Sequence, residues 1–269
     1  MSYKTFCIAT LFVFQVCPGN AQTKDDVNTG SGFSIEPFYW LLRTNPDLHA
    51  GSTFTGSIPG SLKFPGKAKR APGAILNFPA GKGSTLRVSA FRVQGSGSTT
   101  AAQELNLFSN DITAGDLLVT SYTIQNAKVS WDYLTYPFQL GRSAFRVKTL
   151  WEVQYTNIKS RISAPAHVSD SALSPVTANG SRQVVLPTLG LGLENTVSRH
   201  FRWEVKGSGF ALPHRSDIWD AEGTVAFRAG QFEILGGEKA YHFKTSPKNT
   251  QYFAATLFGA YVGLRWYWK

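Results

Sequence analysis

The sequence predicts an all-β protein, a transmembrane up-and-down antiparallel β-barrel of about ten strands, with eight or twelve strands as alternatives. Three observations lead to this class. The last residues, Asn249 to Lys269, alternate at a period of two and carry one charge, Arg265, before the terminal lysine. Charged residues make up only 16% of the chain and aromatic residues 13%, whereas soluble domains carry about a quarter charged residues. Short and long connections alternate between the expected strands, as they do in barrels that cross a membrane.

The last stretch is the clearest strand. One file of alternate residues is apolar and ends in aromatic side chains, while the other file is smaller and holds Arg265. That pattern is expected when one face meets lipid and the other a packed or wet lumen. A buried helix is the alternative, because the thirteen residues from Tyr252 to Leu264 carry no charge. This run is too short to cross a bilayer as a helix and is poor in strong helix formers.

The beginning of the chain resembles an export signal. Lys4 is followed by an apolar run from Phe6 to Val16, and Gly19 and Ala21 have the spacing of a signal-peptidase site, which predicts a cut after Ala21. Both cysteines fall in this segment, so the mature chain would use neither a disulfide nor a thiolate metal site. A lipoprotein signal is a minor alternative, since the residues before the second cysteine are large. The predicted domains are a signal peptide (1–21), a polar periplasmic lead-in (22–32) and the barrel (33–269).

The rest of the chain divides into strands marked by alternating apolar residues and connections marked by Gly, Pro, Ser and Lys. Pro37 is unusual in a central strand and predicts a bulge or strain there. The outward file after Ala90 slips to Phe91, which predicts another bulge. The longest expected loops are 43–73, 96–115 and 159–182. The expected strands are 33–42, 74–78, 85–94, 117–136, 145–155, 185–193, 201–209, 219–228, one that begins at 232, and 249–269.

Charged residues recur on the file opposite the apolar one. The interior of a ten-stranded barrel is narrow, so these eight bases and seven acids should pair across it and keep the lumen polar. A soluble β-sandwich explains single strands equally well, but it gives no cause for the aromatic strand ends or the loop asymmetry. The expected lumen charges are Glu36, Arg87, Lys128, Asp132, Arg146, Lys148, Glu152, Arg202, Glu204, Lys206, Asp220, Glu222, Arg228, Glu233 and Arg265.

The remaining charge is basic. The formal net charge is +10, of which Lys4 accounts for one and the lumen for another, leaving about eight on loops, turns and strand ends. A basic outer rim attracts phosphate-bearing lipid headgroups, and a merely solvated surface is the alternative. Nucleic acid is not expected, because the chain is exported and has no basic helix or recognised motif. The expected headgroup contacts are Lys63, Lys67, Lys69 and Arg70.

With its signal segment, its cysteine-free mature chain and strands such as Phe201 to Lys206, the chain resembles the small bacterial outer-membrane β-barrel proteins. This resemblance implies a location in the outer membrane, and lipopolysaccharide, the barrel-assembly machinery and small solutes as partners. In that superfamily the last strand carries the assembly signal and typically ends in Phe or Trp, whereas Lys269 ends this chain. The corresponding residues are Phe258, Val262, Leu264, Trp266 and Trp268.

The leading interpretation is a non-enzymatic barrel, either structural or a narrow porin-like pore. No catalytic residue, cofactor or metal site is expected, and His49, His167 and His200 lack metal-ligand spacing. Whether the lumen conducts is left open by the sequence.

An outer-leaflet barrel enzyme is the alternative. Omptin-like proteases use acidic residues and an Asp–His pair at the outer rim, and here His214, Asp217, Asp220 and His242 could approach one another. Lipid A deacylases use a His-x-Ser sequence with a downstream Glu, which His214-Arg215-Ser216 and Glu222 match loosely.

Overall fold

The computed structural model describes residues 32–50, 60–65, 68–81, 83–134, 138–140, 143–169, 172–213, 215–247 and 251–268. The predicted signal peptide, and all of the lead-in except Gly32, lie outside the described residues. In the described part of the chain, no helix is long and apolar enough to cross a membrane.

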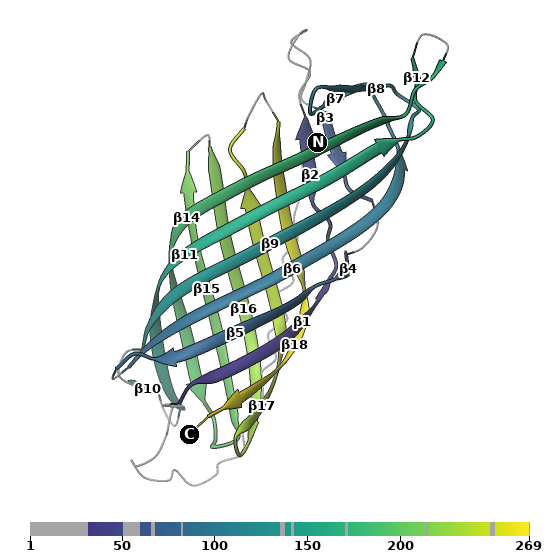
Figure 1. The fold of residues 1–269 in the computed structure, drawn as a ribbon. Coiled ribbons are helices and arrows are strands. Elements are labelled where there is room, and N and C mark those ends of the chain that lie inside the picture. Colours follow the sequence, from purple (N-terminus) through teal and green to yellow (C-terminus); the bar gives the residue numbers. More distant parts are fainter. Residues whose placement is uncertain are drawn as a thin grey trace.

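Ten strands close into an antiparallel barrel, in which each strand pairs with the next along the chain (Figure 1). The first strand also pairs with the last, so the barrel wall has no open edge. The predicted all-β barrel and its strand number are therefore confirmed. The barrel strands are β1 (Ser34–Leu42), β5 (Pro72–Pro79), β6 (Ser84–Thr100), β9 (Leu117–Leu134), β11 (Ser143–Ala164), β14 (Val176–Thr196), β15 (Phe201–Leu212), β16 (Ser216–Ala229), β17 (Phe232–Lys244) and β18 (Tyr252–Tyr267).

Short and long connections alternate as predicted except near Pro213, where the connection 213–215 between β15 and β16 is shorter than 135–142 between β9 and β11. The other short connections lie at the end of the barrel where Trp268 N–H donates to the carbonyl of Phe33 at 2.9 Å, here called the inner end. The opposite, outer end carries further short strands built from the long connections. These strands are β2 (Asp47–Ala50) and β3 (Gly60–Lys63) beside β18, β4 (Ala68–Arg70) beside β6, and the hairpins β7 (Leu105–Leu107) with β8 (Asn110–Ile112) and β12 (Val168–Ser169) with β13 (Ala172–Leu173). The inner end has one further short strand, β10 (Phe138–Leu140), beside β11.

The barrel is taller on one side than on the other. Strands β6, β9, β11 and β14 have 17, 18, 22 and 21 residues, whereas β15, β16 and β17 have 12, 14 and 13. The predicted loops 96–115 and 159–182 are therefore shorter than expected, because their flanking strands continue outward beyond the apolar stretch on which the prediction rested.

Neither predicted bulge is present. The pairing of β1 with β5 runs without a shift from Ser34 to Tyr39, across Pro37. The pairing of β6 with β9 is likewise continuous through Phe91. Phe91 and Val93 point into the lumen and are 7% and 0% exposed. The lumen changes from polar to apolar along this strand. In the sequence, apolar residues therefore move to the inward positions, which looks like a shift of the outward file by one residue.

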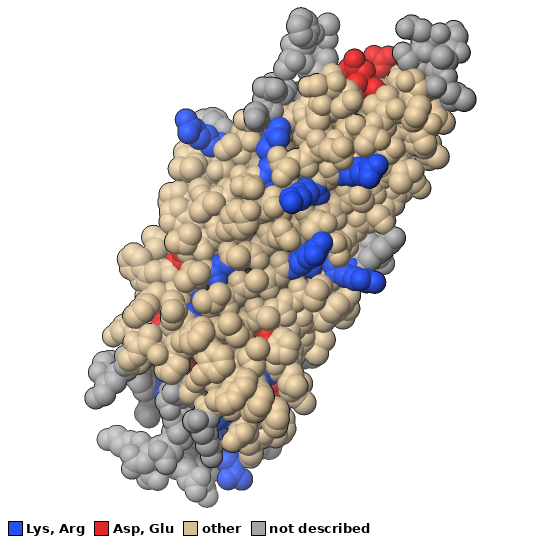
Figure 2. Space-filling model, viewed as in Figure 1, with Lys and Arg blue, Asp and Glu red and all other residues tan. Residues whose placement is uncertain are grey.

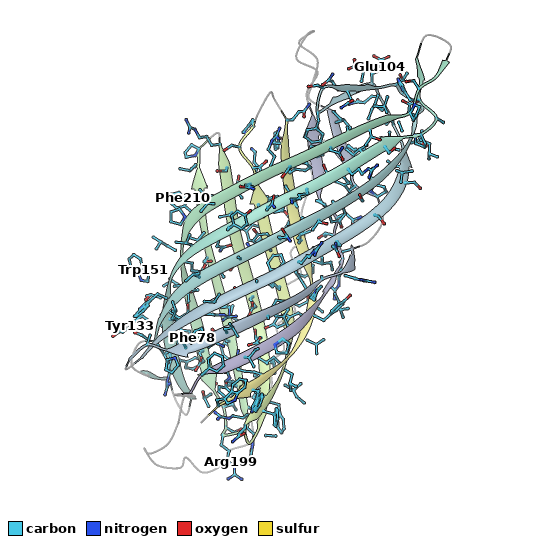
Figure 3. All side chains as sticks on the ribbon, in the orientation of Figure 1. Phe78, Glu104, Tyr133, Trp151, Arg199 and Phe210 are labelled. Carbon is cyan, nitrogen blue, oxygen red and sulfur yellow. The ribbon has the colours of Figure 1, made fainter. Side chains whose placement is uncertain are left out.

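The outward file makes an apolar wall, the surface expected to face lipid. Trp151 is 61% exposed, Leu191 63% and Ile234 60%. Figure 3 shows the labelled side chains of Phe78, Tyr133, Trp151 and Phe210 projecting away from the barrel. The residues predicted as the assembly signal, Phe258, Val262, Leu264, Trp266 and Trp268, are also exposed on this wall.

The first and last strands meet at a seam with close backbone approach. The indole of Trp40 donates to the carbonyl of Gly259 at 3.0 Å, and Thr44 donates to the carbonyl of Thr256 at 2.7 Å. A Cβ at Gly259 would lie 2.0 Å from the carbonyl oxygen of Leu41. Glycine at this position therefore allows β1 to pack against β18.

Candidate functional site

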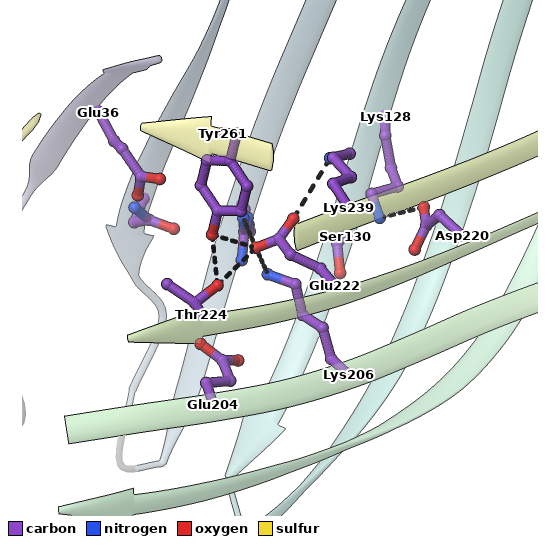
Figure 4. A network of polar contacts seen from close by, with 12 residues as sticks. Glu36, Lys128, Ser130, Glu204, Lys206, Asp220, Glu222, Thr224, Lys239 and Tyr261 are labelled. Carbon is purple, nitrogen blue, oxygen red and sulfur yellow. Dashed lines mark hydrogen bonds and ion pairs between the residues drawn. The ribbon is translucent and has the colours of Figure 1, made fainter. Parts of the chain in front are cut away.

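The inner half of the lumen is filled by buried charges that meet at Glu222 (Figure 4). Its carboxylate lies 3.0 Å from Lys206 Nζ, 3.3 Å from Lys239 Nζ and 3.9 Å from Arg87 Nη2. The hydroxyl of Tyr261 also donates to it at 3.2 Å. Strands β6 and β16 are five places apart in the ring of ten, so the contact of Arg87 with Glu222 spans the lumen.

A second cluster also crosses from wall to wall. Lys128 Nζ lies 2.7 Å from Asp220 Oδ2 and 3.1 Å from Glu152 Oε1. The amide of Gln154 donates to Asp220 at 3.0 Å. Each of these charges has an opposite charge or a hydrogen-bond donor, which offsets the cost of its removal from water.

Nearer the inner end, the charges form a chain of alternating sign. Every cation in it touches two carboxylates, so neighbouring strands are linked in series. The contacts run from Lys148 to Glu204 (2.9 Å) and Glu194 (2.6 Å), from Arg202 to Glu194 (3.6 Å) and Glu233 (2.6 Å), and from Arg265 to Glu233 (2.8 Å) and Glu36 (2.8 Å).

The structure places the predicted lumen charges as follows. Eleven are buried, namely Glu36, Arg87, Lys128, Asp132, Glu152, Glu204, Lys206, Asp220, Glu222, Glu233 and Arg265. Lys148, Arg202, Arg146 and Arg228 are half-buried toward the inner end.

Sequence reasoning missed two lumen charges. Glu194 and Lys239 are buried and ion-paired, whereas the sequence predicts a turn at 194–199 and a loop at 239–248. For Lys239 a signal was available, because it shares its file with Leu235 and Tyr241, which are also buried.

The outer half of the lumen is apolar. We call the side chains that fill it the outer plug: Trp40, Phe64, Phe91, Leu107, Tyr122 and Phe253. Phe91 lies 5.4 Å from Trp40 and 5.2 Å from Tyr241, measured between ring centroids, and β6 and β17 are on nearly opposite sides of the ring. Phe64 and Leu107, both 0% exposed, enter from connections of the outer end.

Polar side chains also lie where the plug meets the charges, and Lys239 Nζ lies 5.7 Å from the centre of the Phe91 ring. Asn126 Nδ2 donates to the hydroxyl of Tyr241 at 3.0 Å and to Thr156 at 3.1 Å. Strands β9 and β17 are five places apart, so this contact also spans the lumen. The described side chains therefore bridge opposite walls both among the charges and where Asn126 and Phe91, which are cross-strand neighbours, meet Tyr241.

The outer wall carries exposed bases on its tall side, beyond the apolar stretch. We call Arg70, Arg92, Lys159 and Arg161 the basic belt; all four are exposed. In register, Arg70 pairs with Gln94, Gln94 with Thr123, and Thr123 with Lys159. Figure 2 shows Lys and Arg side chains spread over the upper half of this face, with few acidic atoms among them.

Two shallow hollows adjoin the basic belt. One of about 440 Å³ is lined by Ala90, Arg92, Ala127 and Tyr155 among others, and one of about 390 Å³ is lined by polar residues with Lys159 and Arg161. None of the described residues that line them is acidic. Apolar and basic groups therefore meet at one level of the wall.

Of the predicted headgroup contacts, Lys63 and Arg70 are exposed, and only Arg70 joins the belt. Lys67 and the side chain of Lys69 lie outside the described residues. Arg92, Lys159 and Arg161 are not among the predicted headgroup contacts. Lys159 and Arg161 fall in the expected loop 159–182, and the expected slip of the outward file to Phe91 leaves Arg92 on the opposite file.

The residues considered for an enzyme are only partly brought together. His242 Nε2 lies 2.7 Å from Asp217 Oδ1 on the outer wall. Asp220 faces the lumen, where it pairs with Lys128. Ser216 is buried, Glu222 is the centre of the lumen network, and His214 lies outside the described residues.

A closed ten-stranded wall, apolar outside and filled with paired charges inside, is the fold of an outer-membrane β-barrel. The crystal structure of the outer membrane protease OmpT from Escherichia coli is similar to it, with a TM-score of 0.56 and 10% identity over 89% of this chain and 98% of that one. The toluene transporter TodX from Pseudomonas putida matches with a TM-score of 0.31 and 11% identity over 87% and 89% of the two chains. At 10% identity the likeness to OmpT shows the fold alone. No protein-family model and no curated protein sequence matches the chain.

Proposed function

We propose that the protein is a bacterial outer-membrane barrel with a sealed lumen, which works through its outer wall and not as a pore. The observation that carries this is the set of contacts across the lumen at two levels. Arg87 reaches Glu222 at one level. At the other, the cross-strand neighbours Asn126 and Phe91 both reach Tyr241. Of the two non-enzymatic roles the sequence suggests, these contacts favour the structural one over the narrow pore.

We expect the folded protein to give no single-channel conductance in planar bilayers. Buried side chains of the described residues meet across the lumen, and hydrated ions do not pass a packed apolar plug. Retarded or accelerated migration of unheated samples on detergent gels would first establish that the inserted protein is folded. Reproducible discrete current steps from such samples would overturn the sealed lumen.

The outer wall is proposed to bind phosphate-bearing lipid, with lipopolysaccharide as the partner in the outer leaflet. The support is the height of the basic belt. On β11 the outward file is apolar from Phe145 to Tyr155, and those ten steps match the roughly 9–11 residues of a tilted strand that crosses the hydrocarbon layer. On the same file Asn157 follows this stretch, and Lys159 and Arg161 come next, at the proposed level of the headgroups.

Replacing Arg161 with serine should weaken binding to bisphosphorylated lipid A in nanodiscs about fivefold, since one base near an anionic surface contributes about 1 kcal/mol. Replacing Arg92, Lys159 and Arg161 together should weaken it about 100-fold. Arg199→Ser is the matched control, because Arg199 is exposed at the inner end (Figure 3). Equal affinities for all three variants, or for dephosphorylated lipid A, would leave only a solvated basic surface.

A further inference from the structure

Three side chains form a chain of polar contacts on the outer wall of the short side. His242 Nε2 lies 2.7 Å from Asp217 Oδ1, and His242 Nδ1 lies 2.8 Å from the hydroxyl of Thr256. They come from β16, β17 and β18, and Thr256 is the direct cross-strand neighbour of His242. The ring of Trp219 stacks on the imidazole at 5.4 Å with an interplanar angle of 12°. The imidazole is thus fixed in position from two sides and one face.

This order of groups suits nucleophilic chemistry. A carboxylate that accepts Nε2–H holds an imidazole in the tautomer whose Nδ1 can take a proton. We assign this tautomer to His242 because Asp217 lies at Nε2 and the Thr256 hydroxyl at Nδ1. The hydroxyl at Nδ1 is then positioned to lose its proton as it attacks. Thr256 is exposed, so its hydroxyl is open to a molecule at the barrel surface.

The height of the three residues indicates the kind of substrate. Asp217 lies ten residues outward of Phe227 on β16, His242 ten outward of Phe232 on β17, and Thr256 ten outward of Trp266 on β18. Because a tilted strand crosses the hydrocarbon layer in roughly 9–11 residues, all three lie at its outer boundary. Acyl chains are joined to their headgroups by ester bonds at that depth.

We propose that Asp217, His242 and Thr256 form a hydrolytic site for ester-linked acyl chains of outer-leaflet lipid. The hydroxyl oxygen of Thr256 attacks the acyl carbonyl carbon while His242 Nδ1 takes the hydroxyl proton. The ester C–O bond then breaks, and the imidazolium returns the proton to the departing alcohol oxygen. Water, deprotonated by the same imidazole, attacks the carbonyl carbon of the acyl-threonine. The bond to the Thr256 oxygen breaks and the imidazolium returns its proton to that oxygen, so that ester and water give alcohol and fatty acid.

This activity goes beyond the proposed function, because a sealed barrel can bind headgroups without cleaving them. It is tested with the folded full-length mature protein, lipid A vesicles analysed by mass spectrometry, and a 4-nitrophenyl acyl ester in detergent micelles. We expect acyl release that falls about 100-fold or more in Thr256→Val and in His242→Gln. Thr256→Ser should recover measurable activity, because serine restores the hydroxyl.

A second readout does not depend on turnover. A fluorophosphonate with an alkyl chain should label Thr256 covalently in the wild type and leave Thr256→Val unlabelled, as peptide mass analysis would establish. The phosphate-free 4-nitrophenyl ester separates the two proposals, since its hydrolysis does not need headgroup binding. Arg199→Ser, at the inner end of the barrel, is the matched control and should leave this hydrolysis intact. Absence of acyl release from both substrates, or activity that survives Thr256→Val but not Ser216→Ala, would overturn the assignment.

Discussion

Replacing Glu222 with glutamine should lower the free energy of unfolding of the barrel by roughly 3–5 kcal/mol, the usual cost of removing one partner from a buried ionic group. Lys206 and Lys239 lie within 3.3 Å of this carboxylate and Arg87 within 3.9 Å. Glutamine keeps the shape but leaves the three cations without their shared anion. Urea unfolding in detergent micelles, followed by tryptophan fluorescence, measures the change.

Two further variants show whether charge is the cause. Glu238→Gln changes the same chemistry on the outer wall, where Glu238 and Arg43 are about half exposed or more, and it should cost less than about 1 kcal/mol. Adding Lys206→Met to Glu222→Gln should restore part of the lost stability, as a double-mutant cycle would measure. If the double variant loses more unfolding free energy than Lys206→Met and Glu222→Gln lose when their separate losses are added, an unpaired charge is not what destabilises Glu222→Gln.

Truncating Trp40 to alanine should cost about 3–5 kcal/mol, as expected for removal of a large, fully buried aromatic side chain. Trp40 is 1% exposed, packs on Phe91 and donates its indole N–H to Gly259 across the seam. The change opens a cavity in the outer plug and removes a hydrogen bond between β1 and β18. The same unfolding experiment detects it.

Trp151→Ala serves as the comparison, because Trp151 is 61% exposed on the outer wall. We expect it to cost clearly less than Trp40→Ala. Trp40→Phe should lie between the two, since it keeps most of the ring volume but loses the N–H. Equal effects at Trp40 and Trp151 would mean that the outer plug does not contribute to stability.

Much of this architecture could be predicted from alternation alone. The period of two gives each strand an inner and an outer face. Trp40 is on the same file as Glu36, an expected lumen charge, and both lie on the inner face of β1, where they are each 1% exposed. Alternation does not report height along the barrel. Phe91 and Val93 point inward like Arg87 but lie in the apolar half of the lumen. Because the prediction assumes a polar interior along the whole strand, it interprets apolar residues at inward positions as a bulge.

The contacts between strands were harder to predict, because they depend on register. Asp217 and His242 were suspected of meeting, and they do, at 2.7 Å. Thr256 was not suspected, since its place opposite His242 is set by the length of the connection between β17 and β18 and by the pairing that follows it. The residue pattern within a single strand does not predict which residues of the next strand lie beside it.

The seam described above has a consequence for how the chain matures. Trp40 and Gly259 are 219 positions apart, and Glu36 and Arg265 are 229 apart. Contacts so distant in sequence form slowly and only once nearly every residue is available. A shortened polypeptide without β18 would leave two bare strand edges and would aggregate instead of folding in part. The barrel is therefore an all-or-nothing product of the complete chain, and it needs protection from self-association until its two ends join.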